Sequence, residues 1–292
     1  MTDRVRVLVA ASRPSQLLLI AGVYALGVKI ATASGATAAV PALAAGLAAL
    51  LPVAASVHYA NEYADYETDA LTERTPFSGG SGALPASGVD RHVVLRAAAA
   101  ALALGAGLAL AATLLGVLPL PALALLAVIA VFGWQYSVGP LRLAWRGWGE
   151  LDNAALGGLA LPVYGAAVVG GPLGRVALAS VPFFLVVLLN LFATQWPDRK
   201  ADGAVGKDTL AVRWPRRRLR VAYAGIAVLA AVAVVALQPT IIPRPVALAS
   251  TVPAPLLVVG ALGYTRRRVP WPTVSAMVLL AVTQFAAWCW LV

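Results

Sequence analysis

The stretch "HYANEYADYETDALTERTPFSGGS", residues 58–81, follows a long and almost unbroken run of alanine, leucine and valine. Asn61, Asp65 and Asp69 recur in it at four-residue intervals, with three glutamates among them. On a helix this interval places side chains on the same broad side. The sequence therefore predicts an apolar helix that ends in a dense group of acidic residues. Both the apolar run and the acidic residues need an explanation.

The apolar half indicates a membrane protein. The 292 residues are 61% hydrophobic and 12% charged, with a mean hydropathy of +0.84. A soluble domain carries about 25% charged residues, and it has no core that could bury so many long apolar runs. The N-terminus lacks the layout of a cleavable signal peptide. We expect an all-α, polytopic membrane protein with a single domain over residues 1–292.

Apolar runs long enough to cross a bilayer predict about nine transmembrane helices. Proline and glycine interrupt the fourth and fifth of them. The expected spans are 15–34, 38–60, 93–115, 119–136, 153–171, 178–196, 219–237, 245–264 and 271–291.

The charges lie on one side of these spans. If the N-terminus is cytoplasmic, every basic residue except Lys29, Arg175 and Arg244 is cytoplasmic, and so are all twelve acidic residues. The positive-inside rule then predicts a multi-pass protein of the inner cell membrane with its N-terminus and its chemistry in the cytoplasm. The net charge of +10 is explained by these loops, so we expect no nucleic-acid partner.

A second acidic pair follows the sixth span in "LNLFATQWPDRKADGAVGKDTLAVRWP", residues 189–215. Asp198 and Asp202 are again four residues apart. Carboxylates at the end of a helix repel one another and the helix dipole, and hard divalent cations such as Mg²⁺ prefer such oxygen ligands. Basic residues nearby, including Arg74 and Lys207, suit a pyrophosphate held by metal and cations together.

Other polar residues have plainer interpretations. The single cysteine excludes a disulfide framework, and two histidines cannot build a histidine-rich metal site. The arginine runs 216–218 and 266–268 are typical of anchors that face anionic lipid. Glu150 and Asp152 are expected to cap the fifth helix. The acids that we interpret as solvated helix ends are Glu62, Glu67, Glu73 and Asp90.

Four segments resemble the intramembrane prenyltransferases of the UbiA superfamily. They are "SRPSQLLL" at 12–19, "NEYADYETD" at 61–69, "YSVGPLRLAWRGWGE" at 136–150 and "DRKADGAVGKDTLAVR" at 198–213. The resemblance implies nine helices around a central cavity, with the two aspartate motifs facing each other at its cytoplasmic mouth. It also implies Mg²⁺-dependent transfer of a prenyl chain from a prenyl pyrophosphate to a small aromatic acceptor. The last segment is most similar to the branch that prenylates 1,4-dihydroxy-2-naphthoate in menaquinone biosynthesis.

The resemblance also implies roles for individual residues. Asp65 and Asp198 would be central to catalysis, Tyr136 would lie near the developing allylic cation, and residues 74–81 would form part of a cap. The expected Mg²⁺ ligands are Asn61, Asp65, Asp69, Asp198 and Asp202. The expected pyrophosphate-binding cations are Arg13, Arg146 and Lys207.

Several alternatives stay open at this stage. The same fold could serve a terpene cyclase that acts on the prenyl pyrophosphate alone, and intramembrane acids also occur in transporters. Tyr136 could be an interfacial aromatic residue. Gly79 and Gly80 could bring backbone N–H groups to a phosphate or form a flexible turn. Glu62 departs from the family, which often has aspartate there, and neither the prenyl length nor the oligomeric state follows from the motifs.

Overall fold

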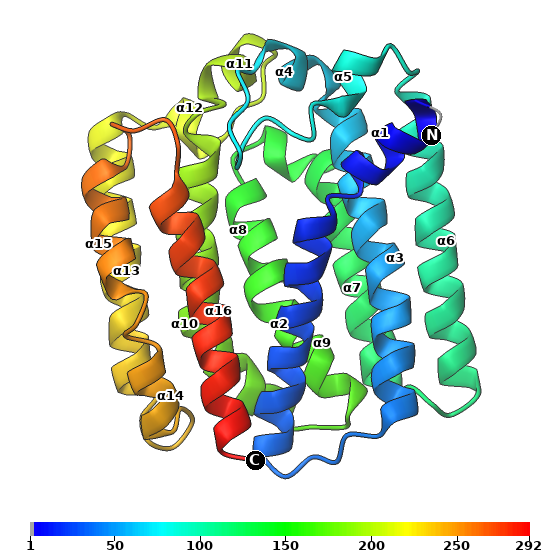
Figure 1. The fold of residues 1–292 in the computed structure, drawn as a ribbon, viewed down its shortest axis with the longest axis vertical. Helices are drawn as coiled ribbons and strands as arrows, with labels where there is room; N and C mark the ends of the chain where they lie inside the picture. The colour runs from blue at the N-terminus through cyan, green and yellow to red at the C-terminus, as the bar shows by residue number, and fades with distance from the viewer. Residues whose placement is uncertain (1–2) are drawn as a thin grey trace.

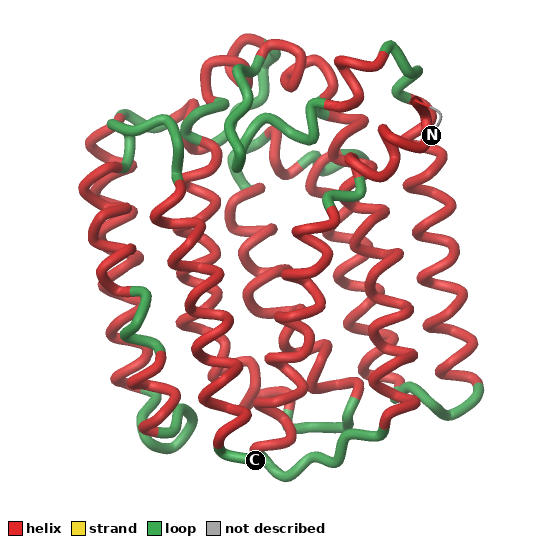
Figure 2. Tube along the Cα trace, viewed as in Figure 1, coloured by secondary structure: helices red, strands yellow, loops and turns green. Residues whose placement is uncertain are grey.

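The computed structural model describes residues 3–292, and this part of the chain consists of helices and loops without a β-strand (Figure 2). Eight of its helical segments are long and apolar enough to cross a membrane, which confirms the expected fold class. These segments are Asp3–Ala33, Val40–Ala64, His92–Leu114, Leu120–Ser137, Leu173–Gln195, Arg216–Ala236, Arg244–Gly263 and Trp271–Trp290.

The long helices stand side by side and run between the same two ends of the molecule (Figure 1). The main core lies where helices near the middle of the bundle pack together, around Tyr24, Leu50, Tyr164, Phe183 and Leu280. The long helices are α2 (Pro14–Ala33), α3 (Val40–Ala64), α6 (His92–Leu114), α7 (Leu120–Ser137), α10 (Leu173–Gln195), α13 (Arg216–Ala236) and α16 (Trp271–Trp290).

The expected fifth span, 153–171, is a composite of three helical pieces. It consists of α8 (Gly149–Ala155), one π-helical turn, η2 (Leu156–Ala160), and α9 (Leu161–Val168). Together with the eight membrane-length segments, it agrees with about nine spans. Pro162 has no N–H for the carbonyl four residues earlier, which favours an irregular turn at this point. A Cβ atom on Gly158 would lie 2.5 Å from Phe184 Cα, so α10 approaches closely here.

The expected span 245–264 is also divided, into α14 (Arg244–Ala249) and α15 (Ala254–Gly263). Pro253 stands directly before α15, where it supplies no backbone donor to continue α14. At the N-terminus a short helix that the hydropathy pattern did not predict, α1 (Asp3–Ala11), precedes α2. The chain turns between them at Arg13, whose φ of 52° is left-handed.

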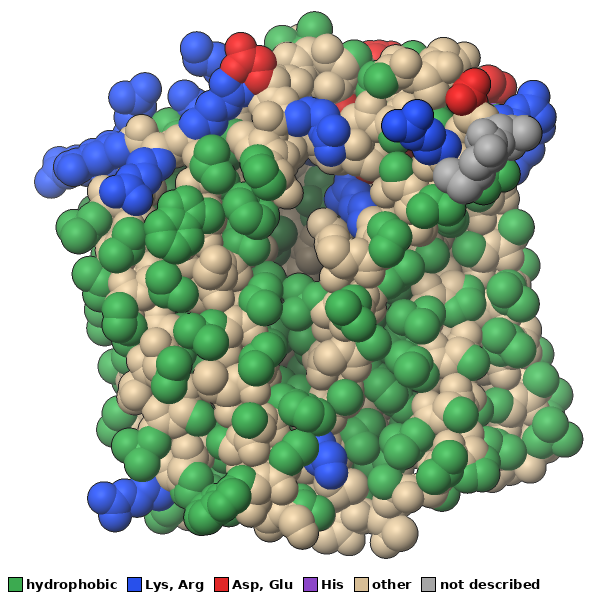
Figure 3. Space-filling model, viewed as in Figure 1, with side chains coloured by type: hydrophobic (Ala, Val, Ile, Leu, Met, Phe, Trp, Pro, Cys, Tyr) green, Lys and Arg blue, Asp and Glu red, His purple; other side chains and the backbone are tan. Residues whose placement is uncertain are grey.

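Short helices gather at one end of the bundle, next to α1 (Figure 1). Lysine, arginine and acidic side chains concentrate at this same end, which we call the charged end, whereas the opposite end shows few charged groups (Figure 3). Just below the charged end the surface is hollowed between α2 and α16. The remaining elements at the charged end are α4 (Tyr66–Leu71), α5 (Ala83–Ser87), η1 (Leu143–Trp145), α11 (Arg199–Ala204) and α12 (Leu210–Arg213).

Candidate active site

Both aspartate motifs are held by local helical hydrogen bonds at the charged end. The N–H of Asp65 donates to Asn61 O at 2.9 Å, and the N–H of Asp69 donates to Asp65 O at 2.7 Å. In the second motif the N–H of Asp202 donates to Asp198 O at 2.9 Å. The four-residue spacing is therefore a helical turn in each motif, and α4 packs against α11. The two motifs lie next to each other, as the family resemblance implies.

Lys207 connects the two motifs. Its ammonium nitrogen Nζ lies 2.7 Å from Asp65 Oδ1 and 3.7 Å from Asp202 Oδ1. The backbone N–H of Lys207 donates to Asp202 O at 2.8 Å, which fixes where the side chain starts. These three side chains are 9%, 11% and 4% exposed, so water screens their charges only weakly. The lysine thus acts as an internal counter-ion between carboxylates from distant parts of the sequence.

Asn61 belongs to the same network. Its side-chain oxygen and nitrogen are best assigned so that the nitrogen donates to Asp65 Oδ2 at 3.1 Å and to Ser137 Oγ at 2.7 Å. In this orientation the oxygen of Asn61 accepts from Arg13 Nη2 at 3.3 Å. The amide therefore links the first motif to α7 and to the junction between α1 and α2.

The loop that contains residues 74–81 lies over the carboxylates, as expected for a cap. The N–H of Gly79 donates to Asp198 Oδ2 at 3.1 Å, and a Cβ atom on Gly80 would lie only 1.9 Å from Asp69 Oδ2. Arg74 holds the loop by donating to Gly79 O at 3.2 Å and to Gly80 O at 3.1 Å. In this arrangement the N–H of Gly79 binds a carboxylate of the second motif rather than pointing at an open anion site.

Burial and mutual repulsion raise the pKa values of several carboxyl groups in this cluster. Burial raises the pKa of Asp69 to about 7, and the charges of Asp65 and Glu62 add to the effect. Burial likewise raises the pKa of Asp202 to about 7 and that of Asp198 to about 6. Burial alone would lower the pKa of Lys207, but Asp65 and Asp202 raise it above its usual value. The cluster contains five carboxyl groups and two cations, so its formal charge is negative when all are ionised; the acids are Glu62, Asp65, Asp69, Asp198 and Asp202, and the cations are Arg13 and Lys207.

The cluster offers a metal ion the right kind of ligands in an arrangement that is not preformed. Among residues 3–292, no three His, Cys, Asp or Glu side chains are already placed together as metal ligands. Lys207 and the N–H of Gly79 bind to carboxylate oxygens that a metal would use. Within the described part of the chain, Asp198 Oδ1 is buried without a hydrogen-bond partner. Such excess negative charge on hard oxygen ligands fits a divalent cation of the Mg²⁺ type.

Comparison with known protein families gives a match over most of the chain. The family model described as the UbiA prenyltransferase family matches residues 19–272, which include both aspartate motifs. The chain belongs to this family. No curated protein sequence gives a significant match to this prenyltransferase.

Solved structures of UbiA homologues share the fold of this prenyltransferase. An apo structure of a homologue from Aeropyrum pernix K1 aligns with a TM-score of 0.69 and 18% identity, covering 91% of this chain and 96% of that one. A homologue from Archaeoglobus fulgidus bound to DMAPP and Mg²⁺ aligns with a TM-score of 0.66 and 18% identity, covering 97% and 99%. A structure reported for digeranylgeranylglyceryl phosphate synthase aligns with a TM-score of 0.66 and 15% identity, covering 98% of each chain.

The three predicted pyrophosphate-binding cations of this prenyltransferase lie in different places. Lys207 is inside the cluster, and Arg13 lies beside it, where its charge acts on Asp69. Arg146 is exposed and donates to Pro140 O at 3.3 Å, so the structure does not bring it to the carboxylates. Tyr136 is half-buried beside Gly149 and lies near Lys207, so its side chain faces the motifs rather than the lipid.

The interpretation of Glu62 as a solvated helix end is wrong. Its side chain is 1% exposed and pairs with Arg13, with 2.7 Å between Glu62 Oε1 and Arg13 Nη2. It also accepts from the N–H of Ser81 at 2.8 Å and from Ser81 Oγ at 2.6 Å. One carboxylate thus joins α3, the junction before α2 and the end of the cap. Glu67 and Glu73 are 71% and 78% exposed and Asp90 is 58% exposed, as expected.

Glu150 differs from the expected helix cap as well. Its side chain is buried, and Oε1 accepts from the backbone N–H of Leu210 at 2.7 Å, which joins α8 to α12. The N–H of Asp208 donates to Trp145 O at 3.3 Å, so the segment before α8 holds the loop that carries Lys207. The segment 136–150, which resembles the family, ends in Glu150, and this was a signal for the residue in the sequence.

Replacing Glu62 with glutamine is expected to loosen the cap and to lower turnover about tenfold. The amide keeps the volume of the side chain but loses the ion pair with Arg13 and the charge-assisted bonds to Ser81, each of which is stronger than a neutral hydrogen bond. Trypsin should then cut faster after Arg74, whose side chain holds the cap. Glu67→Gln, which changes an exposed acid, is the matched control. Unchanged cleavage and turnover in Glu62→Gln would contradict this role.

Proposed function

We propose that this prenyltransferase transfers a prenyl chain from a prenyl pyrophosphate to a small aromatic acceptor within the membrane, with 1,4-dihydroxy-2-naphthoate as the first acceptor to consider. The observation that carries the proposal is the joining of the two aspartate motifs through Lys207, at 2.7 Å from Asp65 and 3.7 Å from Asp202. An excess of carboxylates and adjacent cations suits a pyrophosphate bound together with a divalent metal ion.

Five residues would hold Mg²⁺ in this proposal, and the related structures bound to DMAPP or GPP together with Mg²⁺ support the choice of metal. Bound Mg²⁺ supplies a positive charge that stabilises the leaving pyrophosphate. Asp65 and Asp198 would contribute most, because they come from different motifs and lie close enough for the charge of Asp65 to act on Asp198. The proposed ligands are Asn61, Asp65, Asp69, Asp198 and Asp202.

The protein's own groups have separate tasks in the transfer. Lys207 and Arg13 would bind the pyrophosphate oxygens while the C–O bond breaks and its electron pair leaves with the pyrophosphate. A ring carbon of the acceptor then attacks the allylic cation and loses a proton, which restores the aromatic ring. Tyr136, which faces the motifs, would stabilise the cation through its ring. The apolar helices exclude water, which would otherwise hydrolyse the cation.

The surroundings of the site fit a lipid-like substrate. The hollow between α2 and α16 lies just below the charged end (Figure 3), where a prenyl chain could extend toward the bilayer. We place the charged end in the cytoplasm and the protein in the inner cell membrane, because the loops at this end carry nearly all the basic residues.

The test is an incubation of the purified protein with Mg²⁺ and geranylgeranyl pyrophosphate, with and without 1,4-dihydroxy-2-naphthoate. Mass spectrometry of the lipid extract should detect a product that carries both the prenyl and the naphthoate masses, and EDTA should abolish it. A parallel incubation with a glyceryl phosphate acceptor distinguishes another acceptor class found in the family. A hydrocarbon or alcohol formed from the pyrophosphate alone would overturn the transfer to an acceptor and favour a terpene cyclase.

A further inference from the structure

Arginines crowd one sector of the charged end, around the N-terminus of α13 and the loop between α15 and α16 (Figure 3). Arg268 pairs with Glu73, and Arg220 donates to Thr265 Oγ1 at 2.6 Å. Several other arginines of this sector have no carboxylate partner among the described residues 3–292. They are Arg199, Arg216, Arg217, Arg218, Arg266 and Arg267.

Two of these guanidinium groups share one aromatic ring. The guanidinium carbon of Arg199 lies 3.5 Å from the ring centre of Trp196, and that of Arg216 lies 5.6 Å from the same centre. Arg199 is also fixed by donating from Nη1 to Trp196 O at 2.6 Å. Two like charges at one ring repel each other, and an anion bound between them would offset the repulsion.

The ring that carries these charges is firmly held. Trp196 is 6% exposed and packs edge-on against Tyr264, with 6.4 Å between the ring centres. Tyr264 in turn lies against Tyr223, with 5.0 Å between ring centres, and Tyr223 is hydrogen-bonded to Thr273 at 2.8 Å. The end of α10 is thereby packed onto α13, α15 and α16, and the arginine pair has a rigid base.

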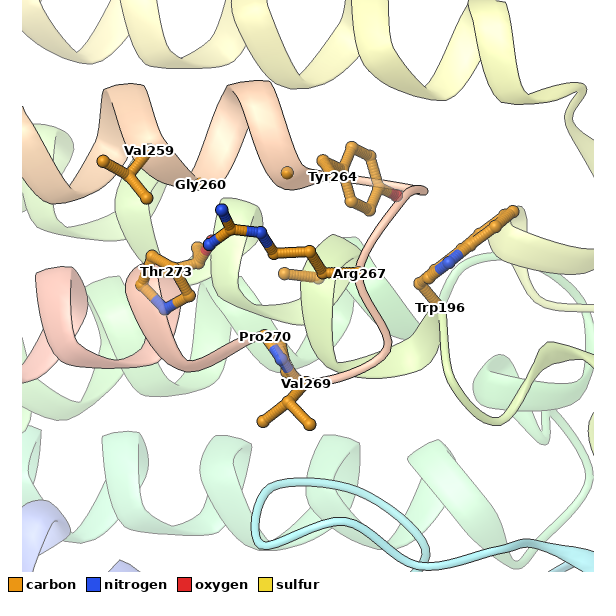
Figure 4. Close-up of a pocket in the computed structure, with 11 residues that line it drawn as sticks. Trp196, Val259, Gly260, Tyr264, Arg267, Val269, Pro270 and Thr273 are labelled. Carbon is orange, nitrogen blue, oxygen red and sulfur yellow. The ribbon is translucent and has the colours of Figure 1, made fainter.

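A crevice opens beside Trp196 between α15 and α16 (Figure 4). Val259, Pro270 and Thr273 form part of its wall, and the Arg267 side chain extends along it, with Trp196 and Tyr264 toward one end. Exposed apolar side chains continue from it along the surface of α15, where Val258 and Leu262 are 59% and 68% exposed. The crevice therefore lies where an apolar surface that faces lipid meets unpaired positive charge.

We propose that this place binds an anionic phospholipid. Arg199 and Arg216 contact the phosphate, Arg267 contacts the headgroup from the crevice, and the exposed apolar side chains of α15 lie against the glycerol and the first carbons of an acyl chain. A zwitterionic lipid binds less well, since its choline or ethanolamine cation would lie among arginines. Arg199 belongs to the second aspartate motif in sequence, but its guanidinium group lies over Trp196, so the lipid site stands whether or not the proposed acceptor is correct.

Native mass spectrometry of the purified protein in detergent tests the site by titration with phosphatidylglycerol and, separately, with phosphatidylcholine. The double variant Arg199→Gln/Arg216→Gln is compared with Arg217→Gln/Arg218→Gln. The second pair loses the same charge on the same sector, but Arg218 lies over Trp214 at 4.0 Å and neither residue contacts Trp196. Trp196→Phe keeps an aromatic ring for packing and weakens only the cation–π contacts.

We expect the wild type to bind phosphatidylglycerol about tenfold more tightly than phosphatidylcholine, which corresponds to about 1.4 kcal/mol. The double variant Arg199→Gln/Arg216→Gln should lose about tenfold in affinity for phosphatidylglycerol. The control variant Arg217→Gln/Arg218→Gln should lose less than about twofold, and Trp196→Phe should lose an intermediate amount. An equal loss of affinity in the two double variants would overturn the proposed site, because it would show that phosphatidylglycerol is attracted to the positive charge of this sector in general. Equal binding of the two lipids would also overturn it. Displacement of phosphatidylglycerol by inorganic pyrophosphate would show a site for a soluble anion instead of a lipid.

Discussion

Replacing Asp198 with alanine, or Asp65 with asparagine, is expected to lower turnover by at least about a hundredfold while the protein stays folded. Each change removes a carboxylate from the set proposed to hold a divalent cation, and with it the stabilisation of the leaving pyrophosphate. Asp198 is the cleaner test, because among residues 3–292 its Oδ1 has no hydrogen-bond partner, while Oδ2 accepts from the N–H of Gly79 at 3.1 Å. Asparagine at position 65 keeps a hydrogen-bond acceptor for Lys207.

The matched controls for this experiment are Glu67→Gln and Asp90→Asn, which change exposed acids at the same end of the molecule. Turnover should be measured at several Mg²⁺ concentrations, together with the thermal unfolding midpoint of each variant in detergent. Near-normal turnover in Asp198→Ala or Asp65→Asn would rule out the two-motif metal site. A fall in turnover of the same size in the controls would point to charge at this end in general.

Replacing Lys207 with methionine is expected to destabilise the metal-free protein by about 3 kcal/mol or more, because it leaves buried carboxylates without their counter-ion. The side chain keeps a similar length, so packing changes little. The variant should gain more thermal stability from added Mg²⁺ than the wild type does, since Asp65 and Asp202 are then free to bind it. Turnover should fall as well, because a proposed contact with the pyrophosphate is lost.

Lys200→Met provides the control, since it removes an exposed lysine from the same loop region. The measurement is the thermal unfolding midpoint with EDTA and with increasing Mg²⁺. If Lys207→Met and Lys200→Met respond to Mg²⁺ in the same way, Lys207 does not compete with a metal for the carboxylates. Unchanged stability in EDTA would show that its 2.7 Å contact with Asp65 contributes little.

Hydropathy predicted the helical bundle well because a spanning helix must satisfy its backbone within one continuous apolar segment. Pro162 marks an interruption near the π-helical turn at Leu156–Ala160, but hydropathy does not show the close packing of Gly158 against Phe184 there. The division between α14 and α15 has a local cause in Pro253, yet mean hydropathy over the span conceals it.

The site was predicted where its geometry is local and missed where it depends on tertiary contacts. The four-residue spacing of Asp65 and Asp69 is a helical turn, so the sequence alone indicated a shared face. Glu62 resembles any acid at a helix end, and its partners Arg13 and Ser81 are 49 and 19 residues away. Arg146 was assigned by a motif, and no pattern in the sequence shows that its side chain lies against Pro140.

The counter-ion role of Lys207 has a consequence for a cell in which magnesium is scarce. Because an internal ammonium group already neutralises part of the acidic cluster, folding and membrane insertion need not wait for the ion. A fall in available magnesium would then slow the reaction while leaving the amount of protein unchanged, and resupply would restore the rate without new synthesis. The enzyme would remain in the membrane as a reserve through such shortages.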